Sequence, residues 1–211
     1  MHGENPTRRS AQGYVLAGGG STRFGRDKAL VEIDGVAMLL RMHALLSAVA
    51  RPVNVIAPPF RYAALGITSM SDRWEGQGPL AGIITALLAS RDNGSGEWNL
   101  IVGCDMPFLT REWLSYLVGR AFASGAEVVT PRSAQGLEPL CTCWRTSAAT
   151  KLQNTFDRGV RKITEAMKSL EMEVVDEPDW KRFDTSGRLF WNMNTAADFD
   201  EAKRILEAQR A

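Results

Sequence analysis

The residues best suited to chemistry lie near the start of the chain, in a glycine-rich segment that carries two key cations. Three consecutive glycines, Gly18–Gly20, follow the apolar run Tyr14–Ala17. Arg23, Asp27 and Lys28 come after them. Glycines permit positive φ angles and a close backbone approach, so successive N–H groups can converge on phosphate oxygens. Arginine adds a planar fork of donors and lysine a mobile positive charge. The segment therefore predicts a site for a nucleoside triphosphate.

Two common phosphate-binding loops do not fit this segment. A Walker loop has lysine directly after its second glycine, whereas Gly25 is followed by Arg26. The dinucleotide-binding fingerprint has its third glycine where this chain has Arg23. A glycine-rich turn without a ligand is the remaining alternative, and the charges of Arg23 and Lys28 argue against it.

Asp105 is the strongest candidate for a metal ligand. It directly follows the largely apolar run Asn99–Cys104 and precedes the turn-forming pair Met106–Pro107. A carboxylate at the end of a buried strand is placed to bind Mg²⁺ that bridges phosphates. An aspartate that only opens a turn before a proline is the competing interpretation, because aspartate is common there. The glycine-rich segment in the same chain favours the metal site.

Two further segments offer groups to a ligand. The segment Gly76–Ile83 leads into a helix with Pro79 in its first turn, and its glycines suit close packing against a planar base or an anion. Near the other end of the chain, Asn192 and Asn194 point the same way if the backbone is extended, and each amide offers donors and an acceptor. Helix capping explains Asn194 but leaves Asn192 without a role.

The composition predicts one domain with a substantial core and no nucleic-acid partner. The chain has 211 residues, 45% of them hydrophobic, and its net charge of +1 implies no basic face. Three cysteines without zinc-like spacing fit a reduced, cytoplasmic protein, and a metal site built from them and His43 is a minor alternative.

Residues 1–12 are predicted to be a flexible tail, because the apolar run after Arg8–Arg9 is too short for a secretion signal. No segment reaches the length of a membrane span.

Apolar runs and helical periodicities alternate through residues 13–211, which are predicted to form a single domain. Strands or short apolar segments are predicted at Tyr14–Ala17, Pro52–Ala57, Ile67–Met70, Trp98–Gly103, Ala126–Pro131 and Leu140–Trp144. Helices are predicted at Val36–Val49 after an Asp34–Gly35 turn, at Pro79–Ser90, from a Thr110 cap to Ser124, at Ser147–Leu170 with a break near Gly159, and from Thr195 with Asp198 as a capping carboxylate. The alternation predicts the α/β class: a three-layer α/β/α sandwich with a mostly parallel sheet, and ligands at the carboxyl ends of its strands.

The glycine-rich segment resembles the LAGGxSxRMGxDK signature of nucleotidyltransferases, specifically of the molybdenum cofactor guanylyltransferases. Residues 16–28 match every fixed position except the methionine, which is Phe24 here. Further similar motifs follow in family order and extend the resemblance from Tyr14 to about Ala202: GPLAGI at Gly78–Ile83, CDMP at Cys104–Pro107, EPL at Glu138–Leu140, GVR at Gly159–Arg161, and NMNT at Asn192–Thr195, where Ala196 replaces the usual proline.

The resemblance implies a Rossmann-like sheet of the nucleotide-diphospho-sugar transferase type and a Mg²⁺-dependent reaction. GMP would pass from GTP to molybdenum-molybdopterin, giving molybdopterin guanine dinucleotide and pyrophosphate. The implied catalytic residues are Arg23, Lys28 and Asp105, and the implied nucleotide-binding residues are Leu16, Ala17, Gly18, Gly19, Lys28, Asp72, Gly78, Pro79, Leu80 and Asp105. Mg²⁺ is expected at Asp105, together with Asn192 and Asn194. Pro139, Arg161 and Lys162 are expected near the pterin, although a solvated helix face explains the two cations equally well. Cofactor-delivery proteins and molybdoenzymes are the expected partners.

One departure from the family and two alternatives stay open. The family typically offers an asparagine to the nucleotide after the second strand, whereas this chain has Ile56–Pro59, so contacts from that loop are not implied. The forms LAGG and GPLAGI favour guanine over cytosine. A cytidylyltransferase or a sugar-phosphate nucleotidyltransferase is the nearer alternative, although sugar pyrophosphorylases usually carry proline where this chain has Asp27. The other alternative is a non-catalytic relative that only binds nucleotides.

Overall fold

A central sheet forms from the short apolar runs of the chain. The computed structural model describes residues 10–18, 27–94 and 96–208. The strands of the main sheet are β1 (Gln12–Leu16), β4 (Val53–Ile56), β5 (Ser69–Met70), β6 (Trp98–Gly103), β7 (Val128–Ser133), β8 (Gly136–Leu137), β9 (Cys141–Arg145) and β10 (Met172–Val175). Their order is β10–β7–β9–β6–β1–β4–β5, and β8 pairs with β7. Along this path β9 is antiparallel to both neighbours and every other pairing is parallel, so the predicted mostly parallel sheet is confirmed.

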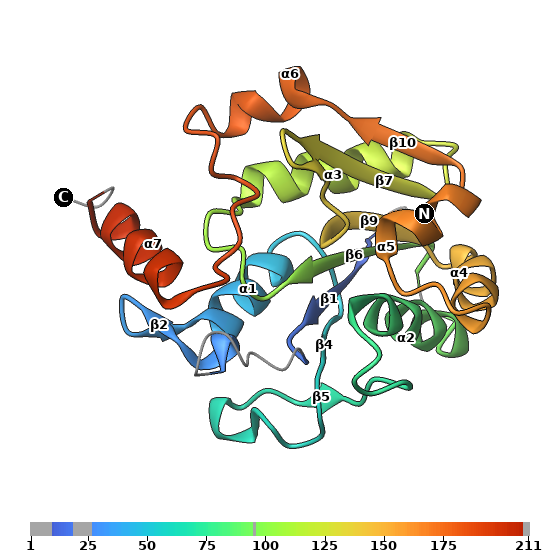
Figure 1. Ribbon diagram of the computed structural model, residues 1–211, viewed down its shortest axis with the longest axis horizontal. Coiled ribbons are helices and arrows are strands. Elements are labelled where there is room, and N and C mark those ends of the chain that lie inside the picture. Colours follow the sequence, from blue (N-terminus) through green and yellow to red (C-terminus); the bar gives the residue numbers. More distant parts are fainter. Residues whose placement is uncertain (1–9, 19–26, 95, 209–211) are drawn as a thin grey trace, which may run out of the picture.

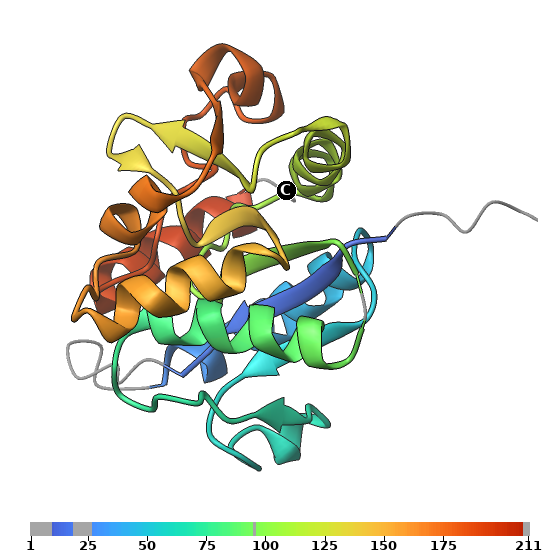
Figure 2. The same cartoon turned by 90° about the vertical axis from the view of Figure 1, so that its right-hand side faces the viewer.

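Helices cover both faces of this sheet and form the two outer layers (Figures 1 and 2). One face packs against α1 (Met38–Ser47) and α3 (Arg111–Ala123), and the other against α2 (Pro79–Asp92) and α4 (Ala148–Asp157). Buried apolar side chains fill a separate cluster on each face. Every residue of α2 from Leu80 to Ser90 is buried, which explains why its sequence is apolar all round. The three-layer α/β/α prediction is therefore confirmed.

Shorter elements complete the fold. A small hairpin, β2 (Glu32–Ile33) and β3 (Val36–Ala37), turns at the predicted Asp34–Gly35. The remaining helices are α5 (Ile163–Ala166), α6 (Glu177–Trp180) and α7 (Ala196–Ala208), with 3₁₀ turns at Lys28–Leu30, Ala63–Leu65, Met167–Ser169 and Lys181–Phe183. In the described part of the chain, no helix is long and apolar enough to cross a membrane.

The ends of the elements agree with most of the predicted capping signals. The Thr110 hydroxyl accepts a hydrogen bond from Trp113 N at 3.2 Å and begins α3. The Asp198 carboxylate accepts from the backbone N–H groups of Asn194 and Thr195, both at 2.8 Å, ahead of α7. Both caps satisfy N–H groups that lack partners within the helix.

The predicted tail of residues 1–12 is too long by at least two residues. Its first nine residues lie outside the described part of the chain. Ala11 and Gln12, in contrast, are buried, and Gln12 begins β1. Arg51 N donates to Ala11 O at 2.8 Å, so the backbone is held before the predicted start of the strand at Tyr14.

The register of three neighbouring strands brings their following loops together. Leu16 at the end of β1 lies opposite both Ile56 at the end of β4 and Gly103 at the end of β6. Beyond the strands, Ala17 N donates to Ile56 O at 3.0 Å and Cys104 N donates to Leu16 O at 3.3 Å. The segments that carry Gly18, Pro58 and Asp105 therefore leave the same edge of the sheet side by side.

Candidate active site

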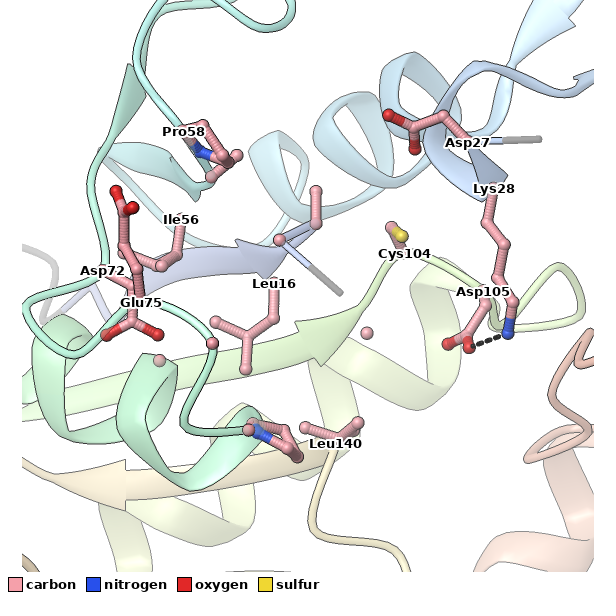
Figure 3. Close-up of a pocket in the computed structure, with 18 of the residues that line it drawn as sticks. Leu16, Asp27, Lys28, Ile56, Pro58, Asp72, Glu75, Cys104, Asp105 and Leu140 are labelled. Carbon is pink, nitrogen blue, oxygen red and sulfur yellow. Dashed lines mark hydrogen bonds and ion pairs between the residues drawn. The ribbon is translucent and has the colours of Figure 1, made fainter. Parts of the chain in front are cut away.

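A cavity of about 660 Å³ lies at this carboxyl edge of the sheet (Figure 3). Its volume is in the range of small-molecule sites. The segments after β1, β4 and β6 form its walls together with the loop before α2. The lining residues are Leu16, Ala17, Gly18, Asp27, Lys28, Ile56, Ala57, Pro58, Asp72, Glu75, Gly76, Gly78, Pro79, Gly82, Gly103, Cys104, Asp105, Leu140 and Asn194.

One end of the cavity carries an ion pair. The Lys28 ammonium lies 3.2 Å from Asp105 Oδ2 and donates to Asn194 Oδ1 at 3.0 Å. The side chains of Lys28 and Asp105 are 15% and 21% exposed, so both are held by the protein yet reachable from the cavity. The backbone also joins these segments, because Met193 N donates to Asp105 O at 2.9 Å. Three distant parts of the sequence thus meet around one cation and one carboxylate.

Gly103 leaves the space that the Asp105 carboxylate occupies. A Cβ atom at residue 103 would lie 2.9 Å from Asp105 Oδ1 and 3.6 Å from Leu140 Cβ. Real side chains essentially never approach so closely, so a larger residue would displace the carboxylate. The glycine at the end of β6 therefore belongs to the geometry of this site.

The oxygen atoms that the protein offers around Asp105 fit a magnesium ion shared with a substrate better than a metal held by the protein alone. In the described ranges, no group of three or more His, Cys, Asp or Glu side chains is arranged to hold a metal. Mg²⁺ is commonly bound through one or two carboxylates, several waters and the phosphates of a substrate. Asp105 offers the carboxylate of that pattern, and the amide oxygen of Asn194, which contacts the same Lys28 ammonium, offers a second oxygen. The minor alternative of a cysteine and His43 metal site finds no such cluster among these residues.

The Asp27 side chain holds the backbone turn that carries Lys28. Its Oδ1 accepts from Ala29 N at 3.1 Å and caps the 3₁₀ turn that begins at Lys28. Its Oδ2 accepts from Arg61 Nε at 2.8 Å. The Tyr62 hydroxyl lies 3.2 Å and 3.1 Å from the two carboxylate oxygens. Asp27 is thus held by two side chains from the loop after β4.

Two carboxylates lie at the opposite end of the cavity, as Figure 3 shows. Asp72 Oδ1 accepts from Trp74 N at 3.0 Å and from the buried Thr85 hydroxyl of α2 at 2.9 Å, which fixes the side chain. Glu75 lies in the same loop and is exposed. Gly78 then adopts a φ of +88° that favours glycine and begins α2, with Pro79 in its first turn. This end of the cavity offers acceptors, whereas the other offers a cation.

The cysteines are buried and are unsuited to act as nucleophiles. Burial, together with the charges of Asp105 and Asp27, raises the pKa of the Cys104 thiol far above its ordinary value. Burial likewise raises the pKa of the Cys141 thiol to about 12 and that of Cys143 well above the usual range. All three thiols therefore stay protonated near neutral pH. Cys141 and Cys143 pack in the same apolar cluster, as expected for small apolar side chains on one face of a strand.

The structure brings most of the predicted site residues that it describes to this cavity, but not all. Those that line it are Leu16, Ala17, Gly18, Lys28, Asp72, Gly78, Pro79, Asp105 and Asn194. Gly19 and Arg23 lie outside the described residues. The Leu80 side chain is fully buried in the core, and Asn192 donates to Phe190 O at 3.0 Å. Leu80, Asn192, Pro139, Arg161 and Lys162 do not line the cavity.

Arg161 contacts the loop before α2. Its guanidinium lies 3.8 Å from the centre of the Phe156 ring, and its Nε donates to Gln77 Oε1 at 3.1 Å. With Trp74, Glu75 and Asp157 these residues line a second, more open hollow of about 390 Å³. Glu75 belongs to both this hollow and the main cavity.

Several lining residues were not predicted from the sequence. Glu75 and Gly103 belong to this group, whereas Gly82, Leu140 and Asp27 lie within motifs described above but were not named as site residues. Gly103 carried a usable signal, because it immediately precedes the Cys104–Asp105 pair at the end of a strand. The segment Ile56–Pro58, which lacks the usual asparagine, nevertheless lies on the cavity wall.

Comparisons with known proteins identify the family of the chain. A family model described as the MobA-like NTP transferase domain matches residues 13–172. The molybdenum cofactor guanylyltransferase of Desulfosudis oleivorans is 28% identical over 200 residues, covering 94% of this chain and 96% of the relative. A probable molybdenum cofactor guanylyltransferase of Opitutus terrae is 32% identical over 198 residues, covering 91% and 94% of the two chains.

Solved structures share the fold. Molybdopterin-guanine dinucleotide biosynthesis protein A from Archaeoglobus fulgidus superposes with a TM-score of 0.79 at 24% identity, covering 93% of this chain and 99% of that one. A CMP:2-keto-3-deoxy-manno-octonic acid synthetase solved with CTP has a TM-score of 0.67 at 12% identity, covering 95% and 99% of the two chains. The expected nucleotide-diphospho-sugar transferase type of sheet is therefore confirmed.

Proposed function

As a member of the MobA-like NTP transferase family, the chain is a nucleotidyltransferase, and we propose that it transfers the GMP of GTP to molybdopterin. The main support is a single cavity that joins Gly18, the Lys28 ammonium and the Asp105 carboxylate at the carboxyl edge of the sheet. Relatives that match nearly the whole chain are named molybdenum cofactor guanylyltransferases, which supports GTP and the pterin as substrates.

The two ends of the cavity suit the two ends of a nucleotide. Lys28 supplies positive charge for the triphosphate, together with Arg23 from the glycine-rich segment. At the other end, the carboxylates of Asp72 and Glu75 accept hydrogen bonds. Guanine carries N–H donors on both a ring nitrogen and its amino group, and ribose hydroxyls donate as well. We therefore assign the Asp72 end to the nucleoside and the Lys28 end to the phosphates.

The proposed reaction is an in-line substitution at phosphorus. An oxygen of the terminal phosphate of the pterin attacks the α-phosphorus of GTP. The bond from that phosphorus to the bridging oxygen breaks, and pyrophosphate leaves with the electron pair. Such a transfer needs positioning and charge neutralisation rather than a protein nucleophile. The protonated thiol of Cys104, which lines the cavity, is consistent with this requirement.

Asp105 and Asn194 are the residues proposed to hold magnesium. Bound there, Mg²⁺ would neutralise phosphate charge as pyrophosphate departs. Asp105 lies beside Lys28, so the chain itself places a negative ligand and a positive phosphate partner next to each other. Asn192, whose amide is bonded to Phe190 O, is assigned no direct contact with the metal.

Fewer of the residues that line the cavity support the assignment of the pterin site. Leu140 lines the cavity and follows Pro139, so we assign the pterin to this side of Asp105. The assignment of Arg161 and Lys162 to the pterin rests on the family resemblance alone, because both lie off the cavity. Partner proteins that deliver or receive the cofactor stay predictions from that resemblance.

Pyrophosphate release tests this function. The protein is incubated with Mg²⁺ and each of GTP, CTP, ATP and UTP, with and without molybdopterin. We expect release only with GTP and only when molybdopterin is present. Release with CTP instead would identify a cytidylyltransferase. Binding of GTP without release under any condition would identify a non-catalytic nucleotide-binding protein.

A further inference from the structure

One hydroxyl group bridges the two ends of the glycine-rich segment. The Tyr62 hydroxyl lies 2.9 Å from Ala17 O, immediately before the glycines, and 3.1 Å from Asp27 Oδ2, immediately before Lys28. The side chain of Tyr62 is fully buried. Ala17 and Asp27 both line the cavity, so this bridge joins two residues of the cavity wall.

The chemistry of this contact requires a protonated hydroxyl. Both partners are acceptors, one a carbonyl and the other a carboxylate, so the single proton of the hydroxyl is shared between them. Burial, and next the negative charge of Asp27, raise the pKa of Tyr62 far above its ordinary value. The hydroxyl therefore remains a donor throughout the neutral pH range.

Arg61 supports the same carboxylate from outside. Its Nε and Nη2 both lie 2.8 Å from Asp27 Oδ2, and its side chain is 36% exposed. Asp27 in turn accepts from Ala29 N and begins the turn that carries Lys28. Hydrogen bonds to a charged group are stronger than neutral ones. Through their contacts with Asp27, Arg61 and Tyr62 thus connect the loop after β4 to the backbone of Lys28.

We propose that Tyr62 is a positioning residue for the triphosphate, acting with Arg61 through Asp27. Its hydroxyl holds Ala17 and Asp27, the residues at the two ends of the glycine-rich segment, so that Lys28 stays in place at the phosphate end of the cavity. The loop after β4, which lacks the usual asparagine, then contributes to phosphate binding through its contact with Asp27. This role rests on the proposed function because it takes a nucleoside triphosphate as the ligand.

The test compares two nucleotides that differ only in their phosphates. Calorimetry measures the Kd of GTP and of GMP, each with Mg²⁺, for the wild type and for Tyr62→Phe, which removes only the hydroxyl. We expect the variant to bind GTP about tenfold more weakly, or about 1.4 kcal/mol. Its affinity for GMP is expected to stay within about twofold of wild type, because GMP lacks the β- and γ-phosphates. A conservative Arg61→Lys variant is expected to retain more GTP affinity than Arg61→Ala.

Tyr14→Phe is the matched control. Tyr14 is also buried, and its hydroxyl bonds to Gln12 Oε1 at 3.0 Å and to Ser90 Oγ at 2.7 Å, in the core cluster on the other face of the sheet. This variant is expected to lower the melting temperature while leaving the ratio of GTP to GMP affinity unchanged.

Each outcome has one meaning. If Tyr62→Phe lowers the melting temperature but keeps the wild-type ratio of GTP to GMP affinity, Tyr62 is only structural and the inference is overturned. If Tyr62→Phe does not fold, the partly exposed Arg61→Ala is decisive, because it must show the same selective loss of GTP affinity. If the wild type itself does not bind GTP, the proposed function fails independently of either variant.

Discussion

The Lys28 ammonium lies 3.2 Å from the carboxylate of Asp105, 77 residues further along the chain. Neither group is deeply buried, and both face the same cavity. The pair holds both side chains in place at the end of the cavity that we assign to the phosphates. In the proposed reaction the two residues have separate partners, because the carboxylate suits a metal ion and the ammonium suits phosphate oxygens.

The first prediction concerns Asp105. Replacing it with Asn keeps the shape of the side chain and an acceptor for Lys28 but removes the charge that suits Mg²⁺. We expect Asp105→Asn to fold and to lose at least about hundredfold in kcat, the scale on which loss of one electrostatic group acts in other enzymes. Steady-state kinetics at saturating Mg²⁺ and GTP measure this loss. Near-wild-type turnover would exclude Asp105 as the metal ligand.

Two substitutions of Lys28 distinguish the effect of its charge on GTP binding from the effect of its shape. Lys28→Ala is expected to raise the KM for GTP about tenfold and to slow transfer, because it removes a positive charge from the phosphate end. Lys28→Arg keeps the charge but has a bulkier, differently directed head group, so it should restore activity only in part. Full activity in the arginine variant would show that only charge matters there. An unchanged KM in the alanine variant would contradict the assignment of this end to phosphates.

Gly103 provides a steric test of the same site. A Cβ added at residue 103 would lie 2.9 Å from Asp105 Oδ1, so Gly103→Ala should displace the carboxylate and lower kcat without unfolding the protein. Gly119 in α3 is the matched control, because a Cβ there meets nothing within 4 Å. Gly119→Ala is expected to keep full activity and to gain about 0.5–1 kcal/mol of stability from helix propensity. Equal activity in the two variants would count against a geometric role for Gly103.

The family resemblance implies that Arg161 binds the pterin, whereas in the structure Arg161 contacts the loop before α2. Arg161 Nε donates to Gln77 Oε1 next to Gly78 and Pro79, so Arg161→Ala should loosen that loop and raise the KM for GTP. The neighbouring Lys162 is exposed and serves as the control for the GTP site, since Lys162→Ala should leave the KM for GTP unchanged. A rise confined to the KM for the pterin would instead support the pterin assignment of Arg161.

The sequence was sufficient to predict the main parts of this site because parallel strands end at one edge of a sheet. Glycines after one buried run and an aspartate after another therefore had to lie close together, as Gly18 and Asp105 do. The bridge from Tyr62 to Ala17 and Asp27 depends on where a loop folds back, which no local spacing reveals.

Some elements escaped prediction for a different reason. Strand β10 is only four residues long and contains Glu173, which pairs with Arg120 of α3 at the edge of the sheet. When only one sequence is available, so short an apolar run with a charged residue in it resembles a loop. Leu80 shows the reverse case, because a residue within a ligand-binding motif is buried in the core with the rest of helix α2. Motif membership alone does not separate residues that contact a ligand from those that hold the helix in place.

The most direct measurement follows the label of GTP into the pterin product. The wild type and Asp105→Asn are each incubated with Mg²⁺, molybdopterin and GTP labelled at the α-phosphate, and the products are separated by chromatography and identified by mass. The proposed function predicts that the wild type converts molybdopterin to a labelled guanine dinucleotide with one pyrophosphate released per product, and that Asp105→Asn does not. Label that stays in GTP with the wild type, while an active guanylyltransferase consumes the same molybdopterin preparation, would contradict it.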